Sequence, residues 1–340
     1  MQTFGPTIGW GVLGPGRISH SFAQDLRLVP DARLVAAGSR SLERAQAFVD
    51  QYGEQGEARA YGSYEELVAD ESVDVVYVAS PHALHEEHTM LALEAGKHVL
   101  CEKPMTLEAA STERLFAAAA ERGLFLMEAM WMATNPVVRT VLRLLADGEH
   151  GRPIQVHADL GFPVQAEPTD RLLDPALGGG ALLDMGIYPL TLAHLVLGEP
   201  ESLVGVAALA ESGIDLDVAI AGRYQGGATA ALTASMTAQS PRTATIATDL
   251  GCFHFPRDFH APTRVRWEAH DMSGWETGGA AEQWIEPDEP VIGAGYGNEV
   301  LEVHRCLREG ATSSSVVPPE QTVSLMRQLD TIREQIGLHY

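Results

Sequence analysis

The sequence predicts an α/β fold whose first third forms a doubly wound parallel sheet, and three observations predict it. A short apolar run, residues 8–13, leads through a glycine-rich turn into a helical pattern at residues 18–28. A second run, residues 73–79, is rich in β-branched residues, as buried parallel strands are. Strand-like and helix-like segments then alternate along the chain, which is the order that a parallel sheet with crossover helices requires.

The composition limits the size and the partners of the protein. A chain of 340 residues is long enough for about two domains of ordinary size. The formal net charge of −23 argues against nucleic acid or an anionic membrane as a partner, because both attract basic faces. No apolar run approaches the ~18 residues of a membrane-spanning helix, and no signal peptide is visible. The three cysteines indicate no disulfide framework, so a cytoplasmic location is expected.

The first turn has the spacing of a dinucleotide-binding loop. Gly14 is placed to make the tight turn, and Gly16 lets a pyrophosphate approach the backbone. Ser19 stands where Gly or Ala is usual, but it is still small enough for close packing of the helix on the strand. The amides at the start of the following helix then face the phosphates. We therefore expect Gly14, Gly16, Arg17 and Ile18 to bind the cofactor.

The end of the second predicted strand, residues 33–37, indicates which dinucleotide is bound. An NAD-preferring fold usually has Asp or Glu there to hold the ribose 2′-hydroxyl, whereas a nearby Arg accommodates a 2′-phosphate. Here Ser39 and Arg40 follow the strand, and no carboxylate occurs before Glu43. This pattern favours NADP over NAD. The alternative is that Arg40 is only an exposed residue at a helix start, since arginine is common on surfaces.

The next two predicted strands end in polar residues. Ser80, His82 and His85 follow the strand at residues 73–79, and the strand at residues 97–101 runs into Glu102-Lys103-Pro104. Ligands bind at the carboxyl ends of strands in open α/β sheets, so these side chains are candidates for cofactor binding. The chain has only two lysines, Lys97 and Lys103, which leaves little choice if the chemistry needs one. Taken alone, the Glu-Lys-Pro step fits a simple strand-ending ion pair equally well.

The second half of the chain carries the other candidate side chains. Arg171 and an Asp-Pro step precede three glycines, residues 178–180, which release the chain into a helix. Asp184 and Tyr188 are four residues apart and therefore lie on one face of that helix. By itself such a pair is more often a packing feature. Further expected elements are the strands 154–160, 203–210, 218–224, 229–235, 243–248 and 264–267 and the helices 135–147, 299–308 and 321–336. Scattered histidines show no spacing for a metal site.

Taken in this order, Gly14-x-Gly16, the Ser80-Pro81-x-x-x-His85 turn and Glu102-Lys103-Pro104 resemble the glucose–fructose oxidoreductase/inositol dehydrogenase (Gfo/Idh/MocA) family. The resemblance covers almost the whole chain. It implies a Rossmann domain (residues 1–130) and an α+β domain with a large, mostly antiparallel sheet (residues 131–340), whose final helices pack back on the first domain. It also implies that Lys103 sits beside the nicotinamide, often with a cis peptide before Pro104.

Many members of the family have Asp-x-x-x-His where this chain has Asp184 and Tyr188. Tyrosine resembles instead the branch of glucose–fructose oxidoreductase, dimeric dihydrodiol dehydrogenase and NADP-dependent xylose dehydrogenase. Trp131, at the end of a Glu-Ala-Met-Trp run, and Arg171 also resemble that branch. The resemblance implies that Lys103, Tyr188 and Asp184 are catalytic, with Trp131 and Arg171 also in contact with the substrate. The tyrosine in place of the histidine puts inositol-like substrates in doubt.

The function expected from these residues is an NADP-dependent dehydrogenase acting on a sugar or a cyclic trans-dihydrodiol. One alternative is a lyase, an epimerase or a sugar–sugar oxidoreductase that retains its cofactor; another is a non-catalytic NADP-binding sensor. The candidate Lys103, Asp184 and Tyr188 argue against a sensor, which does not need to keep chemistry. By resemblance the C-terminal sheets pair, so a homodimer or homotetramer is expected. The loops at residues 161–175 and 252–290 are expected to shape the substrate pocket.

Overall fold

The computed structural model describes residues 7–54, 57–167, 169–270 and 282–340. The chain divides into two compact units, one made of Met1–Thr134 with Ile292–Met326 and the other of Asn135–Val291 with Arg327–Tyr340. The last helix, α10 (Pro319–Ile336), contributes residues to both units. Parts of the predicted pocket loops, residue 168 and residues 271–281, lie outside the described residues.

The first unit is built on a six-stranded sheet in the order β3-β2-β1-β4-β5-β6. All five pairings are parallel, which confirms the predicted doubly wound sheet. This is the Rossmann strand order, in which the order reverses between β1 and β4. The strands are β1 (Ile8–Leu13), β2 (Ala32–Gly38), β3 (Arg59–Tyr61), β4 (Val75–Val78), β5 (His98–Glu102) and β6 (Leu126–Ala129). The helices are α1 (Arg17–Leu26), α2 (Leu42–Tyr52), α3 (Tyr64–Val68), η1 (His82–Leu84), α4 (His85–Glu94), α5 (Ala109–Arg122), α6 (Trp131–Thr134) and α9 (Tyr296–Glu309).

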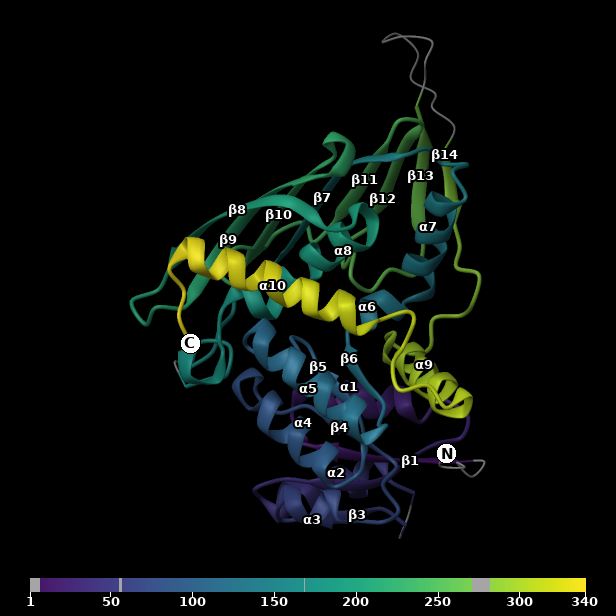
Figure 1. The fold of residues 1–340 in the computed structure, drawn as a ribbon, viewed down its shortest axis with the longest axis vertical. Coiled ribbons are helices and arrows are strands. Elements are labelled where there is room, and N and C mark those ends of the chain that lie inside the picture. The colour runs from purple at the N-terminus through teal and green to yellow at the C-terminus, as the bar shows by residue number, and fades with distance from the viewer. Residues whose placement is uncertain (1–6, 55–56, 168, 271–281) are drawn as a thin grey trace. The chain divides into compact units, whose positions relative to one another are not determined.

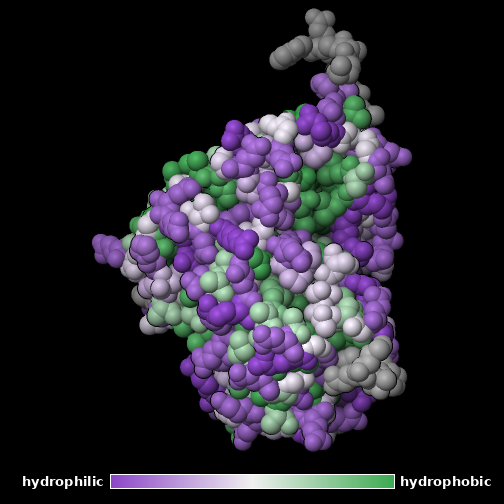
Figure 2. All heavy atoms as spheres, in the orientation of Figure 1, coloured by the Kyte–Doolittle hydropathy of each residue, from purple (hydrophilic) through white to green (hydrophobic). Residues whose placement is uncertain are grey.

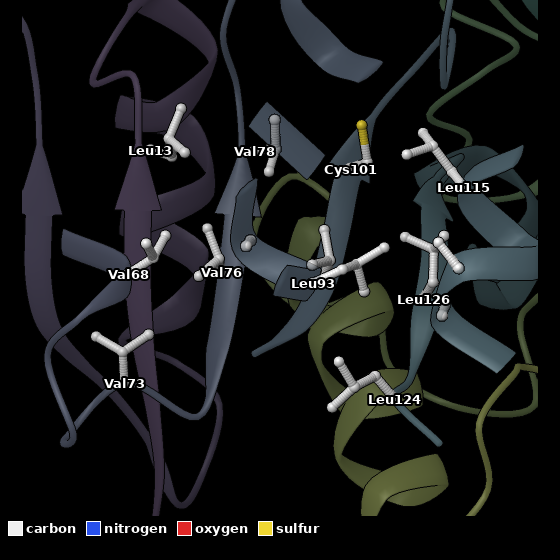
Figure 3. Packing of buried hydrophobic residues seen from close by; sticks show 14 of the residues in the cluster. Leu13, Val68, Val73, Val76, Val78, Leu93, Cys101, Leu115, Leu124 and Leu126 are labelled. Carbon is white, nitrogen blue, oxygen red and sulfur yellow. The ribbon is translucent and has the colours of Figure 1, made fainter. Parts of the chain in front are cut away.

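Apolar side chains from strands and crossover helices form the core of this unit. In Figure 3, Val76 and Val78 of β4, Cys101 of β5 and Leu126 of β6 share a layer with Leu93 of α4. These five residues are at most 1% exposed. Burying a Val or Leu side chain contributes ~1.5–3 kcal/mol, so a layer of this size holds the strand ends in fixed positions.

The second unit is built on an eight-stranded sheet in the order β14-β13-β12-β11-β7-β10-β9-β8. Only β7 and β10 pair in parallel; the other pairings are antiparallel, so the predicted large, mostly antiparallel sheet is confirmed. The strands are β7 (Pro153–Gly161), β8 (Pro200–Leu209), β9 (Asp215–Tyr224), β10 (Thr229–Ser235), β11 (Ala244–Thr248), β12 (Gly251–Phe255), β13 (Val265–Ala269) and β14 (Glu282–Ile285). The strands β12 and β14 were not among those predicted from the sequence.

One face of this sheet is covered by helices and the other is open. Figure 1 shows α8 (Ile187–Leu197) against β7 and β10, and the end of α10 binds β8 through Gln335, which contacts the backbone of Leu203 and Gly205. The remaining helices of the unit are α7 (Pro136–Ala146), η2 (Pro175–Leu177), η3 (Leu182–Gly186) and η4 (Gln225–Gly227). On the open face, Val204 and Val206 are 61% and 65% exposed.

One helical stretch among the described residues, Pro175–Leu197, is long and apolar enough to cross a membrane by length and composition. However, 72% of its apolar window is buried inside the structure, as in the core helix of a folded domain. Figure 2 shows that hydrophilic residues cover most of the visible face, while hydrophobic residues gather between the places that α7 and α8 occupy in Figure 1.

Candidate functional site

Lys103 follows the buried strand β5 at the carboxyl end of the parallel sheet. Its peptide bond to Pro104 is cis, as the resemblance implied. The carboxylate of Glu102 accepts a hydrogen bond from the backbone N–H of Lys103 at 3.1 Å and another from the hydroxyl of Tyr77. Glu102 therefore holds the backbone from which the Lys103 side chain extends.

Two buried side chains hold the backbone just beyond Lys103. A ring nitrogen of His85, Nδ1, lies 2.8 Å from the carbonyl oxygen of Pro104. The N–H of Met105 donates to Oε1 of Glu128 at 3.0 Å, and the hydroxyl of Thr322 donates to Oε2 at 3.2 Å. Glu128 is 1% exposed, and burial raises its pKa to about 7 despite these two hydrogen bonds. Glu128 was not among the predicted site residues. The same signal that indicated Glu102, a carboxylate at the end of an apolar strand, could have identified it.

The other lysine has a structural position. Nζ of Lys97 donates to the carbonyl oxygens of Asp70 and Val73 at 2.7 and 2.8 Å, before the start of β5. Lys97 thus lies at the amino end of the strand, and Lys103 follows its carboxyl end.

The glycine turn after β1 fits a pyrophosphate. Gly14 has φ +86, and a Cβ there would meet the backbone N of Ser80 at 3.2 Å, so only glycine suits the position. A Cβ on Gly16 would meet no atom nearer than 3.9 Å, and no side chain caps the start of α1 at Gly16. The hydroxyl of Ser19 donates to the carbonyl of Gly14 at 2.9 Å, which gives this departure from Gly or Ala a role in the turn. The backbone at Gly16 is thus open to the close approach of a pyrophosphate.

The end of β2 carries the two residues expected near a 2′-phosphate. Ser39 is buried, and its hydroxyl accepts from the N–H of Ser41 at 3.2 Å. Arg40 is exposed. Ser80 follows β4, the second strand along from β2 in the sheet, and its hydroxyl lies 2.8 Å from Nδ1 of His88. Ser39, Arg40 and Ser80 therefore belong to the same edge of the sheet.

The first unit also contains a group of buried acids, Asp25, Glu102 and Glu299. Glu299 of α9 is fully buried, and neither of its carboxylate oxygens has a hydrogen-bond partner in the described part of the chain. Burial raises its pKa well above the usual range, with the charges of Glu102 and Asp25 adding to the effect. The ring of Tyr296 stacks on Trp131 with centroids 4.7 Å apart. Nothing local in the sequence connects α9 with β4 and β5, so these neighbours could not be predicted.

In the second unit a buried carboxylate fixes the start of the helix that carries Asp184 and Tyr188. Oδ2 of Asp215 accepts from the N–H of Leu182 at 2.5 Å. Gly180 has φ +133, and a Cβ there would meet Oδ1 of Asp215 at 2.2 Å. Burial raises the pKa of Asp215 to about 7. The triple glycine is thus a cradle for Asp215 as well as a helix start. An aspartate at the beginning of a strand gives no sequence signal for this contact.

Asp184 lies in a π-helical turn, η3, and Tyr188 in the first turn of α8. Nη1 of Arg171 lies 3.1 Å from Oδ1 of Asp184, an ion pair that was not predicted from the sequence; the Asp184 side chain is 13% exposed. The ring of Tyr188 is nearly buried, with its centroid 4.9 Å from that of His260. π-Helical turns often occur at functional sites.

The predicted residues therefore fall into two groups, one in each unit. The first group follows the carboxyl ends of parallel strands, and comprises Gly14, Gly16, Arg17, Ile18, Ser39, Arg40, Ser80, His82, His85, Glu102, Lys103 and Trp131. The second comprises Arg171, Asp184 and Tyr188. The roles assigned to both groups stay predictions. Among the described residues, no group of three or more His, Cys, Asp or Glu side chains could hold a metal ion.

Comparisons with known proteins agree with this architecture. Residues 8–130 match the family model "Oxidoreductase family, NAD-binding Rossmann fold", and residues 138–254 match the GFO/IDH/MocA C-terminal domain. Trans-1,2-dihydrobenzene-1,2-diol dehydrogenases from Homo sapiens and Xenopus laevis are 34% and 33% identical, over 97% of this chain and 97% and 98% of theirs. A 3-ketoreductase from Actinomadura kijaniata, solved with NADP and TDP-benzene, is 27% identical with a TM-score of 0.84, over 97% of this chain and 98% of that one.

An aldose-aldose oxidoreductase from Caulobacter crescentus shares the fold, with a TM-score of 0.85, 23% identity and coverage of 97% and 98%. The two domain matches and the full-length relatives lead to one assignment: the chain belongs to the Gfo/Idh/MocA family and is an NAD(P)-dependent oxidoreductase that acts on a hydroxyl group.

Proposed function

We propose that this enzyme is an NADP-dependent dehydrogenase that oxidises one hydroxyl of a cyclic trans-dihydrodiol or of an aldopyranose such as D-xylose or D-glucose. The observation that carries the proposal is the carboxyl edge of the parallel sheet, where an open helix start above Gly16 and the Lys103 turn follow strands of the same sheet. Full-length similarity to enzymes named as dihydrodiol dehydrogenases supports the diol, and similarity to a 3-ketoreductase supports the sugar.

When bound, the nicotinamide supplies the acceptor for the hydride that leaves the substrate carbon. Tyr188 takes the hydroxyl proton as the carbonyl forms, and returns it in the reverse direction. A free phenol has a pKa of ~10, so a cation that favours the phenolate is needed for proton transfer near neutrality. Lys103 is assigned that task and a hydrogen bond to the substrate oxygen. Asp184, held by Arg171, binds a second hydroxyl, and Trp131 contacts the substrate ring.

The preference for NADP rests on Arg40 and Ser39 at the end of β2. A guanidinium and a hydroxyl suit a 2′-phosphate, whereas a carboxylate would bind the 2′-hydroxyl of NAD. His82, His85 and Glu102 complete the cofactor edge together with Ser80. The 3-ketoreductase that resembles this chain was solved with NADP.

We further assign residues 1–130 to cofactor binding and residues 131–340 to substrate binding and self-association, with the final helices packed on the first domain. The exposed apolar face of the large sheet, around Val204 and Val206, suits a homodimer or homotetramer. Light scattering of the Val206→Glu variant tests this, since a charge in the interface should yield monomers. A cytoplasmic location fits the three free cysteines.

The test of the function is the formation of reduced cofactor, NADPH from NADP or NADH from NAD, followed at 340 nm with a panel of aldoses and cyclic trans-dihydrodiols. Turnover with NADP and one of these substrate classes is the expected result. Absence of turnover with a cofactor that resists dialysis would favour a retained-cofactor lyase, epimerase or sugar–sugar oxidoreductase. Reversible NADP binding without any turnover would favour a sensor.

A further inference from the structure

His85 is a fully buried histidine whose two ring nitrogens face two carbonyl oxygens. Nδ1 lies 2.8 Å from the oxygen of Pro104, and Nε2 lies 2.8 Å from the oxygen of Ser80. A carbonyl oxygen only accepts hydrogen bonds, and a neutral imidazole carries a single N–H. In a neutral ring one of these two contacts would therefore set one lone pair against another.

We propose that His85 carries a hydrogen on both ring nitrogens at pH 7 and is the positioning residue that fixes the turn of Lys103. Its two acceptors follow β4 and β5, which are adjacent parallel strands. Ser80 also lies against the glycine turn, because its backbone N is the atom that a Cβ on Gly14 would meet first. One cationic side chain thus connects the backbone beside the dinucleotide loop to the backbone beside the proposed catalytic lysine.

The charge of the His85 ring depends on its burial, its hydrogen bonds and the charged groups around it. Burial opposes a charged ring, whereas hydrogen bonds from both N–H groups and nearby carboxylates favour it. The ring of His82 lies 5.7 Å from that of His85 between centroids. The titratable groups on α4 and on the elements packed against it are His82, Glu86, Glu87, His88, Glu94, Tyr64, Glu65, Glu66, Tyr77, His98, Cys101, Glu102, Glu113, Arg114, Glu121 and Arg122, and Lys103 follows β5.

His98, at the start of β5, is a matched control. It is buried like His85, but its Nδ1 accepts a hydrogen bond from the backbone N–H of Phe125 at 2.9 Å. That contact requires an unprotonated nitrogen, and burial lowers the pKa of His98 to about 4. His98 lies at the end of β5 remote from Lys103. A substitution there therefore shows the effect of replacing a buried histidine that does not contact the Ser80 and Pro104 carbonyls.

The direct test is a long-range proton–nitrogen correlation spectrum of the full chain labelled with ¹⁵N-histidine, at pH 7. The variants His85→Gln and His98→Gln assign the signals by their disappearance. His85 is expected to show two protonated ring nitrogens, and His98 one protonated and one unprotonated nitrogen. A spectrum in which His85 has one unprotonated nitrogen at pH 7 overturns the proposal.

The positioning role is tested by kinetics and rests on the proposed function. In a glutamine at position 85 both N–H groups belong to one nitrogen, which does not reproduce two ring nitrogens that face different carbonyl oxygens. Misplacing a reacting group by ~1 Å can cost ~100-fold in rate. We expect His85→Gln to lower kcat at least about tenfold, a larger factor than its effect on the Kd for NADPH, and His98→Gln to leave both nearly unchanged. Unchanged kcat in His85→Gln refutes the role. If no substrate turns over, the spectrum still tests the protonation of His85. A failure of the proposed function can therefore be distinguished from a failure of the proposal about His85.

Discussion

Replacing Glu128 by glutamine is expected to change how the stability of the enzyme depends on pH. The carboxyl group is buried and its pKa is about 7, against 4.5 for an ordinary glutamate. Between these values the folded protein keeps a proton that the unfolded chain has released. The contribution of Glu128 to stability is therefore fully present below pH 4.5 and is lost as the pH rises toward 7. A difference of about 2.5 pH units corresponds to about 3 kcal/mol.

Glutamine removes this ionisation while its amide oxygen can still accept the hydrogen bond from the N–H of Met105. We expect Glu128→Gln and the wild type to have similar free energies of unfolding near pH 4.5, with the variant more stable by up to about 3 kcal/mol at pH 8. Urea denaturation at a series of pH values from 4.5 to 8 measures both differences.

Glu302 provides a control of opposite sign. Burial raises its pKa, but the hydrogen bonds from Arg305, Ser314 and Cys306 outweigh burial and leave the pKa below the usual value. The contribution of Glu302 to the free energy of unfolding is therefore present at neutral pH and lost in acid. We expect Glu302→Gln to be less stable than the wild type at pH 7. A Glu128→Gln difference that stays constant from pH 4.5 to 8 would refute the reasoning about Glu128.

Three further predictions concern the candidate site and its support. Lys103→Met should lower kcat by at least about a hundredfold with little change in NADPH affinity, measured by steady-state kinetics and fluorescence titration; near-normal turnover contradicts the assigned role. Arg40→Ala should weaken the binding of NADPH about tenfold or more but not that of NADH. An equal loss of affinity for both cofactors would refute the contact between Arg40 and the 2′-phosphate. Gly180→Ala should lower the free energy of unfolding by ~1–3 kcal/mol more than Gly213→Ala, since both glycines have positive φ but only Gly180 lies against Asp215. Equal losses of stability in urea denaturation would mean that the Asp215 side chain leaves room for a methyl group at position 180.

The sequence predicted the first unit well because its signals are local. The strands before Gly14 and Lys103 are short apolar runs bounded by turn residues, and parallel sheets repeat that pattern strand by strand. The resemblance added the cis peptide at Pro104 and the antiparallel sheet of the second unit. The strand β14 was missed, because Glu282–Ile285 is short and mostly exposed and so lacks the alternation of a half-buried strand.

The supports of the site could not be predicted, since each joins segments far apart in the chain. Asp215 binds Leu182 across 33 residues, and Thr322 binds Glu128 across 194. No spacing rule relates such positions; only the finished sheet and helices bring them together. The π-helical turn at Asp184 is also without a local signature, because hydrogen bonding rather than residue type distinguishes it from an ordinary helix.

The scarcity of lysine has a practical consequence for studying the enzyme. Lys97 gives two hydrogen bonds to backbone carbonyls, and burial lowers its pKa, whereas Lys103 extends from the cofactor edge. Reductive methylation with ¹³C-formaldehyde would place labels on only two lysine side chains. The lysine region of a carbon spectrum would then hold two resonances, one from a fixed structural amine and one from the proposed catalytic amine. The ionisation of Lys103 could be followed through cofactor and substrate titrations against an internal reference that the chain itself supplies.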